Sequence, residues 1–157
     1  MEKKSTSRRD FVRKSLVAAA GISIIPRHVM GGTNFIPPSD QLTKAVIGVG
    51  GMGQGHLDYE GTRLLAIYLS STLQKVGSGV KGYRDFREVL QRPDVDIVHI
   101  ATPPHWHGLM SIMAAEAGKD VWCEKPMTRT IGEGKKVVEA MQQHGKMFRL
   151  NTWFRFK

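Results

Sequence analysis

The stretch Lys44-Ala-Val-Ile47-Gly48-Val-Gly-Gly-Met-Gly-Gln-Gly-His56 decides the fold of this chain. Its first four residues suit a short strand, and glycines then follow with GxGxxG spacing at Gly48, Gly50 and Gly53. In a dinucleotide-binding turn the first glycine permits the tight turn, the second lets a pyrophosphate approach the backbone, and the third lets a helix pack closely on the strand. We therefore predict a strand, a phosphate-binding turn and a helix whose N-terminus faces the phosphates. The alternative is a glycine-rich turn without a ligand, since the chain has 17 glycines.

The second predicted strand, Arg63–Tyr68, should end in an acidic residue that binds the adenosine ribose of NAD. No acidic residue occurs from Gly61 to Arg84. One interpretation is a preference for NADP, with its extra phosphate bound by Ser70, Ser71, Arg63 or Lys75. The other, which we favour, is a loss of residues, because only a short helix fits between Ser70 and Gly79. For NAD or NADP, the expected contacts in this half are Gly48, Gly50, Gly51, Met52, Gly53 and Ser70.

The second half of the chain alternates helical and strand patterns. Residues 85–90 predict a short helix, and 96–101 a strand buried on both faces. The segment Thr102-Pro103-Pro-His-Trp-His107 follows at the carboxyl end of that strand, the edge at which α/β sheets bind ligands. A helix over 107–117 should be closed by Gly118.

A strand over 120–123 precedes Glu124-Lys125-Pro126, and Thr130 with Glu133 forms a capping box for a helix that ends before Gly145. We expect this helix to carry Ile131, Val138 and Met141 on one face. Residues 146–150 make a further strand. The alternation predicts an α/β fold, a Rossmann-type doubly wound parallel sheet, over 43–157.

The glycine turn, the Thr102-Pro103 to His107 segment, Gly118-Lys119 and Glu124-Lys125-Pro126, in this order, resemble the glucose–fructose oxidoreductase / inositol dehydrogenase / rhizopine-catabolism (Gfo/Idh/MocA) family. The resemblance covers nearly all of 44–157. It implies reversible hydride transfer between nicotinamide and a sugar or polyol.

By the same resemblance, Lys125 contacts the substrate hydroxyl and the nicotinamide, and the proline after it often has a cis bond. Lys125 and His107 are the expected catalytic residues. Thr102, Pro103, His107, Glu124, Lys125 and Pro126 complete the expected cofactor contacts. Plainer interpretations are a surface position for Lys125 and a structural one for His107. Trp106, Trp122 and Cys123 are expected to serve packing alone, and no spacing predicts a metal site.

The amino terminus has a different character. Ser7-Arg8-Arg9-Asp-Phe-Val-Arg-Lys14 precedes an apolar run of about ten residues, half of the roughly 20 that span a bilayer. The pattern resembles a twin-arginine signal, so we expect residues 1–42 to be signal and linker, and the protein to be exported to the periplasm or secreted by the twin-arginine machinery. A basic amphipathic helix on a membrane is the alternative.

The net charge of +9 does not predict nucleic-acid binding. The first fourteen residues hold six basic and two acidic residues, and the remaining surplus is scattered without interleaved aromatic residues.

Family members carry a second, substrate-binding domain that supplies a catalytic histidine. We expect this chain to lack that domain, because it would follow Lys157. We therefore expect this chain alone to turn over no sugar. The apolar end Trp153–Phe156 and an exposed sheet edge should form an uncovered patch, so self-association into a homo-oligomer is one expected outcome. The alternatives to a redox enzyme are an NAD-dependent glycosidase of the same family and a non-catalytic nucleotide-binding module.

Overall fold

The computed structural model describes residues 36–37, 39–59, 61–68 and 79–152. By its internal contacts the chain divides into two units, Met1–Asp40 and Gln41–Lys157, and all elements given below belong to the second. The predicted export signal, the predicted contact Ser70 and the apolar end Trp153–Phe156 lie outside the described residues. No helix within the described ranges is both long and apolar enough to cross a membrane.

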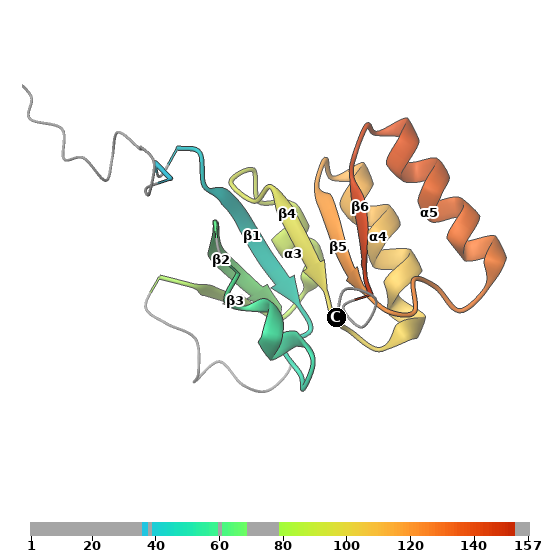
Figure 1. Cartoon of the computed structure of the whole chain (residues 1–157), viewed down its shortest axis with the longest axis horizontal. Helices are drawn as coiled ribbons and strands as arrows, with labels where there is room; N and C mark the ends of the chain where they lie inside the picture. Colours follow the sequence, from blue (N-terminus) through green and yellow to red (C-terminus); the bar gives the residue numbers. More distant parts are fainter. Residues whose placement is uncertain (1–35, 38, 60, 69–78, 153–157) are drawn as a thin grey trace, which may run out of the picture. The chain divides into compact units, whose positions relative to one another are not determined.

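Six parallel strands form one sheet in the order β3-β2-β1-β4-β5-β6 (Figure 1). This order is that of a dinucleotide-binding doubly wound sheet, and it confirms the predicted α/β, Rossmann-type fold. The elements are β1 (Leu42–Ile47), η1 (Gly53–His56), β2 (Thr62–Tyr68), β3 (Lys81–Tyr83), α3 (Phe86–Leu90), β4 (Ile97–Ile100), η3 (Pro104–Trp106), α4 (His107–Glu116), β5 (Asp120–Glu124), α5 (Ile131–Gln143) and β6 (Phe148–Asn151).

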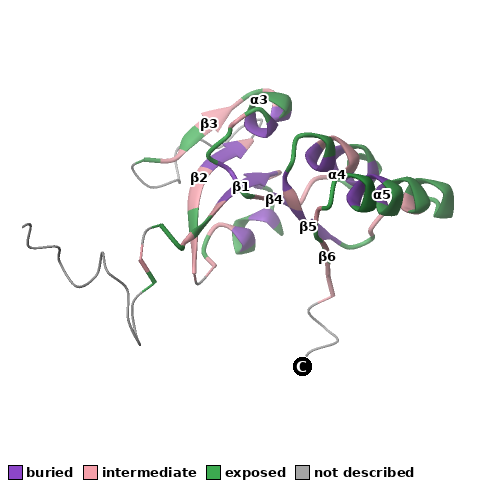
Figure 2. Cartoon of the chain, turned by 90° about the horizontal axis from the view of Figure 1, so that it is seen from above, coloured by how far each residue is buried: buried purple, intermediate pink, exposed green. Residues whose placement is uncertain are grey.

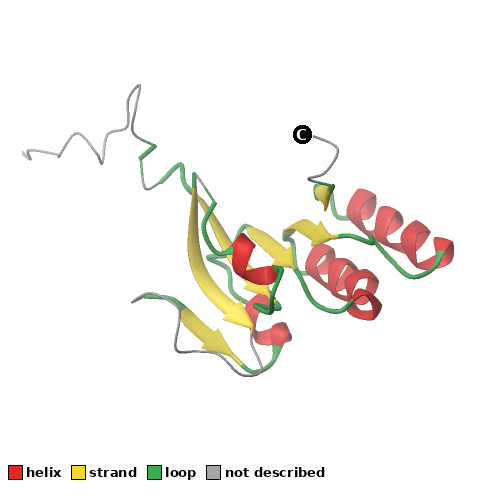
Figure 3. Ribbon diagram, turned by 60° about the horizontal axis from the view of Figure 1, so that its bottom comes forward, coloured by secondary structure: helices red, strands yellow, loops and turns green. Residues whose placement is uncertain are grey.

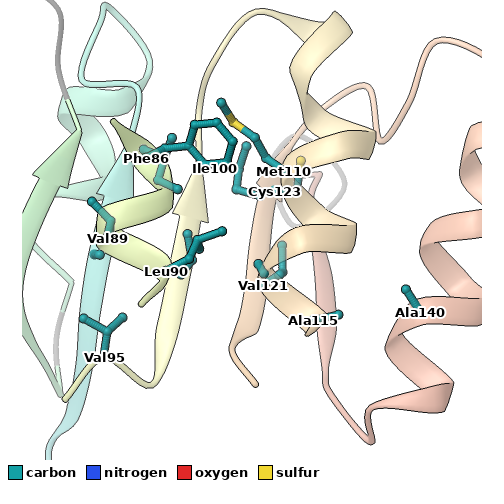
Figure 4. Close-up of a cluster of buried hydrophobic side chains, with 14 of the residues drawn as sticks. Phe86, Val89, Leu90, Val95, Ile100, Met110, Ala115, Val121, Cys123 and Ala140 are labelled. Atoms are coloured by element: carbon teal, nitrogen blue, oxygen red, sulfur yellow. The ribbon is translucent and has the colours of Figure 1, made fainter. Parts of the chain in front are cut away.

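One face of the sheet holds the apolar core and is covered by α3, α4 and α5 (Figure 3). Right-handed crossovers explain this, because the connections from β3 to β4, β4 to β5 and β5 to β6 all run in one direction across the sheet. Ile100 and Val121 of the sheet lie in this layer with Val89 and Met110 of the helices (Figure 4). Val98 belongs to the same buried cluster. Each such fully buried aliphatic side chain contributes about 1.5–3 kcal/mol.

The opposite face is more polar. Successive strand residues point to opposite faces, so Lys44, His99, Trp122 and Glu124 lie here, beside a small apolar cluster of Val46, Val49 and Ile67. Among the described residues, the 3-10 helix η1 and the loop after it lie over this face. Lys44, His99 and Glu124 are buried there despite their polarity. Figure 2 shows the central strand β1 mostly buried, in purple, and the edge strand β3 without buried residues.

The prediction of a helix after the glycine turn is wrong, because only the single 3-10 turn η1 forms there. Only eight residues separate Gly53 from Thr62. The carbonyl oxygen of Tyr59 accepts hydrogen bonds from the Thr62 N–H at 3.2 Å and from the Thr62 hydroxyl at 2.8 Å. This turn directs the chain into β2 before a helix can extend. The proposed phosphate site therefore has backbone N–H groups but no α-helix dipole.

The strand β3, Lys81–Tyr83, was not predicted. Its three residues pair with Ala66–Tyr68 of β2 at the edge of the sheet. A central glycine and a lysine give this segment little strand propensity, so its pairing comes from the tertiary fold.

The helix ends were predicted correctly, and so was the burial of Met141, but the rest of the predicted face of α5 was wrong. Thr130 and Glu133 form the capping box, and Gly118 closes α4 with φ of 74°. Residues Val137, Ala140 and Met141 of α5 are buried, whereas Ile131 is 82% and Val138 47% exposed. The buried stripe follows i, i+3 and i+4 from residue 137, so it is rotated by about one residue, or 100°, from the expected stripe.

Candidate nucleotide-binding site

A cleft of about 630 Å³ opens at the carboxyl ends of β1, β2 and β4. Several predicted contacts line it, from two separate segments of sequence: Gly48, Gly50, Gly51, Thr102 and Pro103. Parallel strands bring these segments together because Ile47 pairs with Ile100 in neighbouring β4, so the two loops leave the sheet side by side. This is the edge at which open α/β sheets bind their ligands.

Two glycines of the turn are required by the protein itself. Gly48 has φ of 93°, and a Cβ there would lie 2.7 Å from the carbonyl oxygen of Ala101. A Cβ on Gly53 would lie 1.8 Å from the carbonyl oxygen of Gly48. Both approaches are far shorter than any real contact, so these residues must be glycine for the turn to close on itself and on β4.

Gly50 and Gly51 behave differently. A Cβ at either position would meet nothing within 4 Å, and neither residue has a positive φ. Neither amide N–H donates to a group within the described residues. The turn thus leaves an open concavity with free backbone donors, which is what a pyrophosphate requires. The residues present therefore fit a dinucleotide.

The wall of the cleft formed by β2 and α3 was missed by sequence reasoning. It is lined by Tyr68, Arg84, Asp85, Phe86 and Arg87. The Asp85 carboxylate accepts the Arg87 N–H at 2.9 Å as the N-cap of α3, and the Arg87 guanidinium lies 3.3 Å from it. Arg84 is exposed. Recognising Lys81–Tyr83 as a strand would have placed these residues at the ligand edge.

Lys125 is exposed at the carboxyl end of β5, and its bond to Pro126 is cis, as the family resemblance implied. It does not line the described cleft, and neither do Glu124 and Pro126. Met52 is 54% exposed beside the turn. Lys125 lies one strand beyond β4, on the same edge of the sheet as Thr102.

His107 is 1% exposed and lies at the start of α4. Its Nδ1 is 2.6 Å from the carbonyl oxygen of Pro126, and its Nε2 is 2.8 Å from that of Thr102. The ring therefore holds together the two loops that carry Thr102 and Lys125. This placement fits the structural interpretation of His107, with neither nitrogen directed into the cleft.

Glu124 is buried in a hydrogen-bonded network that the sequence analysis did not find. Its Oε1 lies 2.9 Å from His56 Nε2 and accepts from Asn151 Nδ2 at 2.6 Å, while Oε2 accepts the backbone N–H of Lys125 at 3.2 Å. Burial raises the pKa of Glu124, but the bonds from His56 and Asn151 outweigh burial and lower it overall. Glu124 is thus held as a carboxylate.

His99 extends this network. Its Nδ1 lies 3.2 Å from Nδ1 of His56, and its ring stacks on Trp122. Burial, followed by the neighbouring His56 and Lys44, lowers the pKa of His99 to about 3, so the ring is neutral. The two facing Nδ1 atoms are within hydrogen-bond distance, so one ring donates and the other accepts.

Lys44 is fully buried in the same layer. Its ammonium lies 5.2 Å from the centre of the Tyr59 ring, and its Nζ makes no hydrogen bond to any residue that the structure describes. Burial lowers the pKa of Lys44, which Asp58 partly offsets. An attractive contact with the ring compensates part of the desolvation cost.

Cys123 points into the apolar core, where burial raises the pKa of its thiol to about 12. It is therefore an unreactive packing residue, as predicted. Trp122 also packs, whereas Trp106 lines the cleft. In the part of the chain that the structure describes, no group of three or more His, Cys, Asp or Glu side chains is arranged to hold a metal ion.

The parallel sheet and the glycine turn at its ligand edge define a dinucleotide-binding domain of the Rossmann type. Residues 42–152 match the family described as "Oxidoreductase family, NAD-binding Rossmann fold", Gfo/Idh/MocA. The chain belongs to this family, which confirms the resemblance and the class of cofactor.

Individual relatives agree with this assignment. The chain is 47% identical over 58 residues to levoglucosan dehydrogenase of Pseudarthrobacter phenanthrenivorans, covering 37% of this chain and 15% of that one. It is 33% identical to glycosyl hydrolase family 109 protein 2 of Shewanella sp. strain ANA-3, over 80% of this chain and 35% of the relative. The crystal structure of myo-inositol 2-dehydrogenase from Lactobacillus plantarum superposes with a TM-score of 0.67 at 26% identity, covering 74% of this chain and 38% of that one. The chain thus spans less than two fifths of the length of these relatives.

Proposed function

We propose that this chain binds NAD or NADP in the described cleft and supplies the nucleotide-binding part of an oxidoreductase that acts on a sugar or polyol. The observation that carries the proposal is the open space at Gly50 and Gly51, where the fold itself has no need of a glycine. The bound cofactor would supply a nicotinamide that accepts or donates hydride.

The chain's own residues would hold this cofactor from two sides. The turn receives the pyrophosphate on the N–H groups of Gly50 and Gly51, which bind no group of the described residues, and Thr102 and Pro103 line the same cleft from the loop after β4. Arg84 and Arg87 add positive charge to the cleft, which suits the phosphates of either cofactor. The network on Glu124 and the His107 ring fix the loop that carries Lys125, whose Nζ would take up the proton of a substrate hydroxyl.

Titration calorimetry of the full chain with NAD and with NADP tests the proposal, with Gly50→Val as the matched variant. A valine should block the pyrophosphate without disturbing the turn, so affinity should fall by about tenfold or more, equivalent to 1.4 kcal/mol. Equal binding by both forms, or no binding of either nucleotide by the unsubstituted chain, would refute the site. Tighter binding of NADP would favour a phosphate-recognising adenosine site.

An NAD-dependent glycosidase is the second candidate, favoured by the similarity to a glycosyl hydrolase family 109 protein over 80% of this chain. Both chemistries would use the same nucleotide cleft. Assays of the full chain with sugars, polyols and nitrophenyl glycosides, each with NAD, separate them: cofactor reduction indicates a dehydrogenase, whereas release of nitrophenol without net reduction indicates a glycosidase.

A further inference from the structure

We propose that Glu124 is a positioning residue. Through its bond to His56, the binding of a phosphate at the glycine turn changes the hydrogen bond that Glu124 accepts from the backbone N–H of Lys125. This inference rests on the proposed function, because it takes the glycine turn as the phosphate site. It adds a physical link between that site and Lys125, which lies outside the cleft.

The first step of the link is the rigidity of the glycine turn. Gly53 packs so closely on the carbonyl oxygen of Gly48 that no side chain fits between them. The turn η1 starts at Gly53, and His56 is its last residue. A displacement of the turn on phosphate binding is therefore carried to His56 through only three residues of compact backbone.

The second step is the contact between His56 and Glu124. Both side chains are buried, 2% and 4% exposed by residue, and the two atoms that meet are 2.9 Å apart. A charge-assisted bond in a water-excluded layer is short and strongly directional. His99 sits against the other ring nitrogen of His56, so the ring cannot turn away without losing that contact.

The third step connects Glu124 to Lys125. Oε1 of Glu124 is occupied by His56 and Asn151, and Oε2 accepts the Lys125 N–H at 3.2 Å. Any rotation of the carboxylate that follows His56 changes this second bond. Because coupling of two sites is reciprocal, an ordered Lys125 loop should also favour the phosphate-binding form of the turn.

The test uses the ¹⁵N-labelled full chain, the backbone N–H resonance of Lys125, and ADP as the probe. ADP carries the diphosphate but lacks the nicotinamide group that would reach Lys125 directly, and adenosine lacks both. We expect ADP to shift the Lys125 resonance and adenosine to leave it in place. Equal shifts with both probes, or none with ADP despite its binding, would overturn the coupling.

Two substitutions at one position sharpen the test. Gln places an amide N–H where His56 Nε2 lies, so His56→Gln should keep the ADP response. The side-chain amide of Asn lies where Nδ1 of His56 lies, so it can still contact His99 but is too short to reach Glu124. His56→Asn should therefore bind ADP but lose the shift of the Lys125 resonance. A full Lys125 response in His56→Asn would overturn the proposal, and if that variant does not fold, the comparison of ADP with adenosine decides alone.

Asn151→Ala is the matched control, because it removes the other bond to Oε1 without interrupting the path from the glycine turn. It should keep the ADP response, and loss of the response here as well would show that the effect is not specific to His56. Calorimetry with NAD separates the two proposals. Absence of NAD binding removes the proposed function and the coupling with it, whereas binding of NAD and ADP with an unmoved Lys125 removes only the coupling.

Discussion

Lys119 donates from Nζ to the carbonyl oxygen of Val95 at 2.8 Å, from the turn after α4 to the loop before β4. The same Nζ donates to the carbonyl oxygen of Arg92 at 2.6 Å, and the residue is 6% exposed. Lys119, part of the segment that marked the family resemblance, therefore holds the ends of two neighbouring strands far from the cleft.

Lys119→Met should keep the packing of the aliphatic stem but leave one buried and one part-buried carbonyl oxygen without this donor. We expect a loss of about 1–3 kcal/mol in the free energy of unfolding, with nucleotide affinity unchanged. Urea denaturation and calorimetry measure the two effects. Lys135→Met, at an exposed position of α5, is the control and should unfold like the unsubstituted chain.

The glycine turn predicts opposite outcomes for two alanine substitutions. Gly53→Ala forces a Cβ against the Gly48 carbonyl oxygen, so the chain should lose about 1–3 kcal/mol of stability or more. Gly50→Ala meets open space and should leave the midpoint of urea unfolding unchanged. A stable Gly53→Ala variant would contradict the described turn.

His107 faces two carbonyl oxygens, and a neutral imidazole has one N–H to donate. His107→Phe removes both contacts from a buried position, so we expect a cost of about 1–3 kcal/mol in urea unfolding. His105→Phe, in the exposed turn η3, serves as the control. If both variants unfold at the same urea concentration, His107 does not hold the two loops together.

Acid should destabilise the fold through His99. Its pKa in the folded chain is about 3, below the usual value of 6.5, so the unfolded chain binds more protons between pH 6.5 and 3. Stability is therefore full above pH 6.5 and falls as the pH decreases through this window, by at most about 1.4 kcal/mol per pH unit from this residue. His99→Phe should be less stable at pH 7 but lose less on acidification, as urea unfolding at pH 7, 5.5 and 4.5 would show. An unchanged slope would contradict a buried neutral His99.

Export is a proposal from the sequence alone. Replacing Arg8 and Arg9 by lysine should retain a folded reporter fusion in the cytoplasm of a bacterium with a twin-arginine pathway. The unsubstituted fusion should appear in the periplasm. Equal export of both fusions would exclude the twin-arginine route.

The sequence predicted five of the six strands, the capping box and the glycine turn, because each depends on local patterns that survive in the fold. The prediction of a helix after Gly53 was wrong because a local turn, closed by hydrogen bonds from Thr62 to the Tyr59 carbonyl oxygen, starts β2 too soon for a helix to form. The contacts among His56, Glu124 and Asn151 were not predictable, since these residues are up to 95 positions apart and meet only through the strand order. The same strand order brings Arg84 to the cleft.

The contrast between the two faces of the sheet also fixes how the strands align. In β4 and β5, Val98, Ile100 and Val121 point to the apolar layer, and His99 and Trp122 point away from it. A slip of β4 by one residue would exchange the faces and place an imidazole under α4. Misaligned pairings of these central strands are thus penalised on both faces at once, so the polar layer selects the correct alignment during folding.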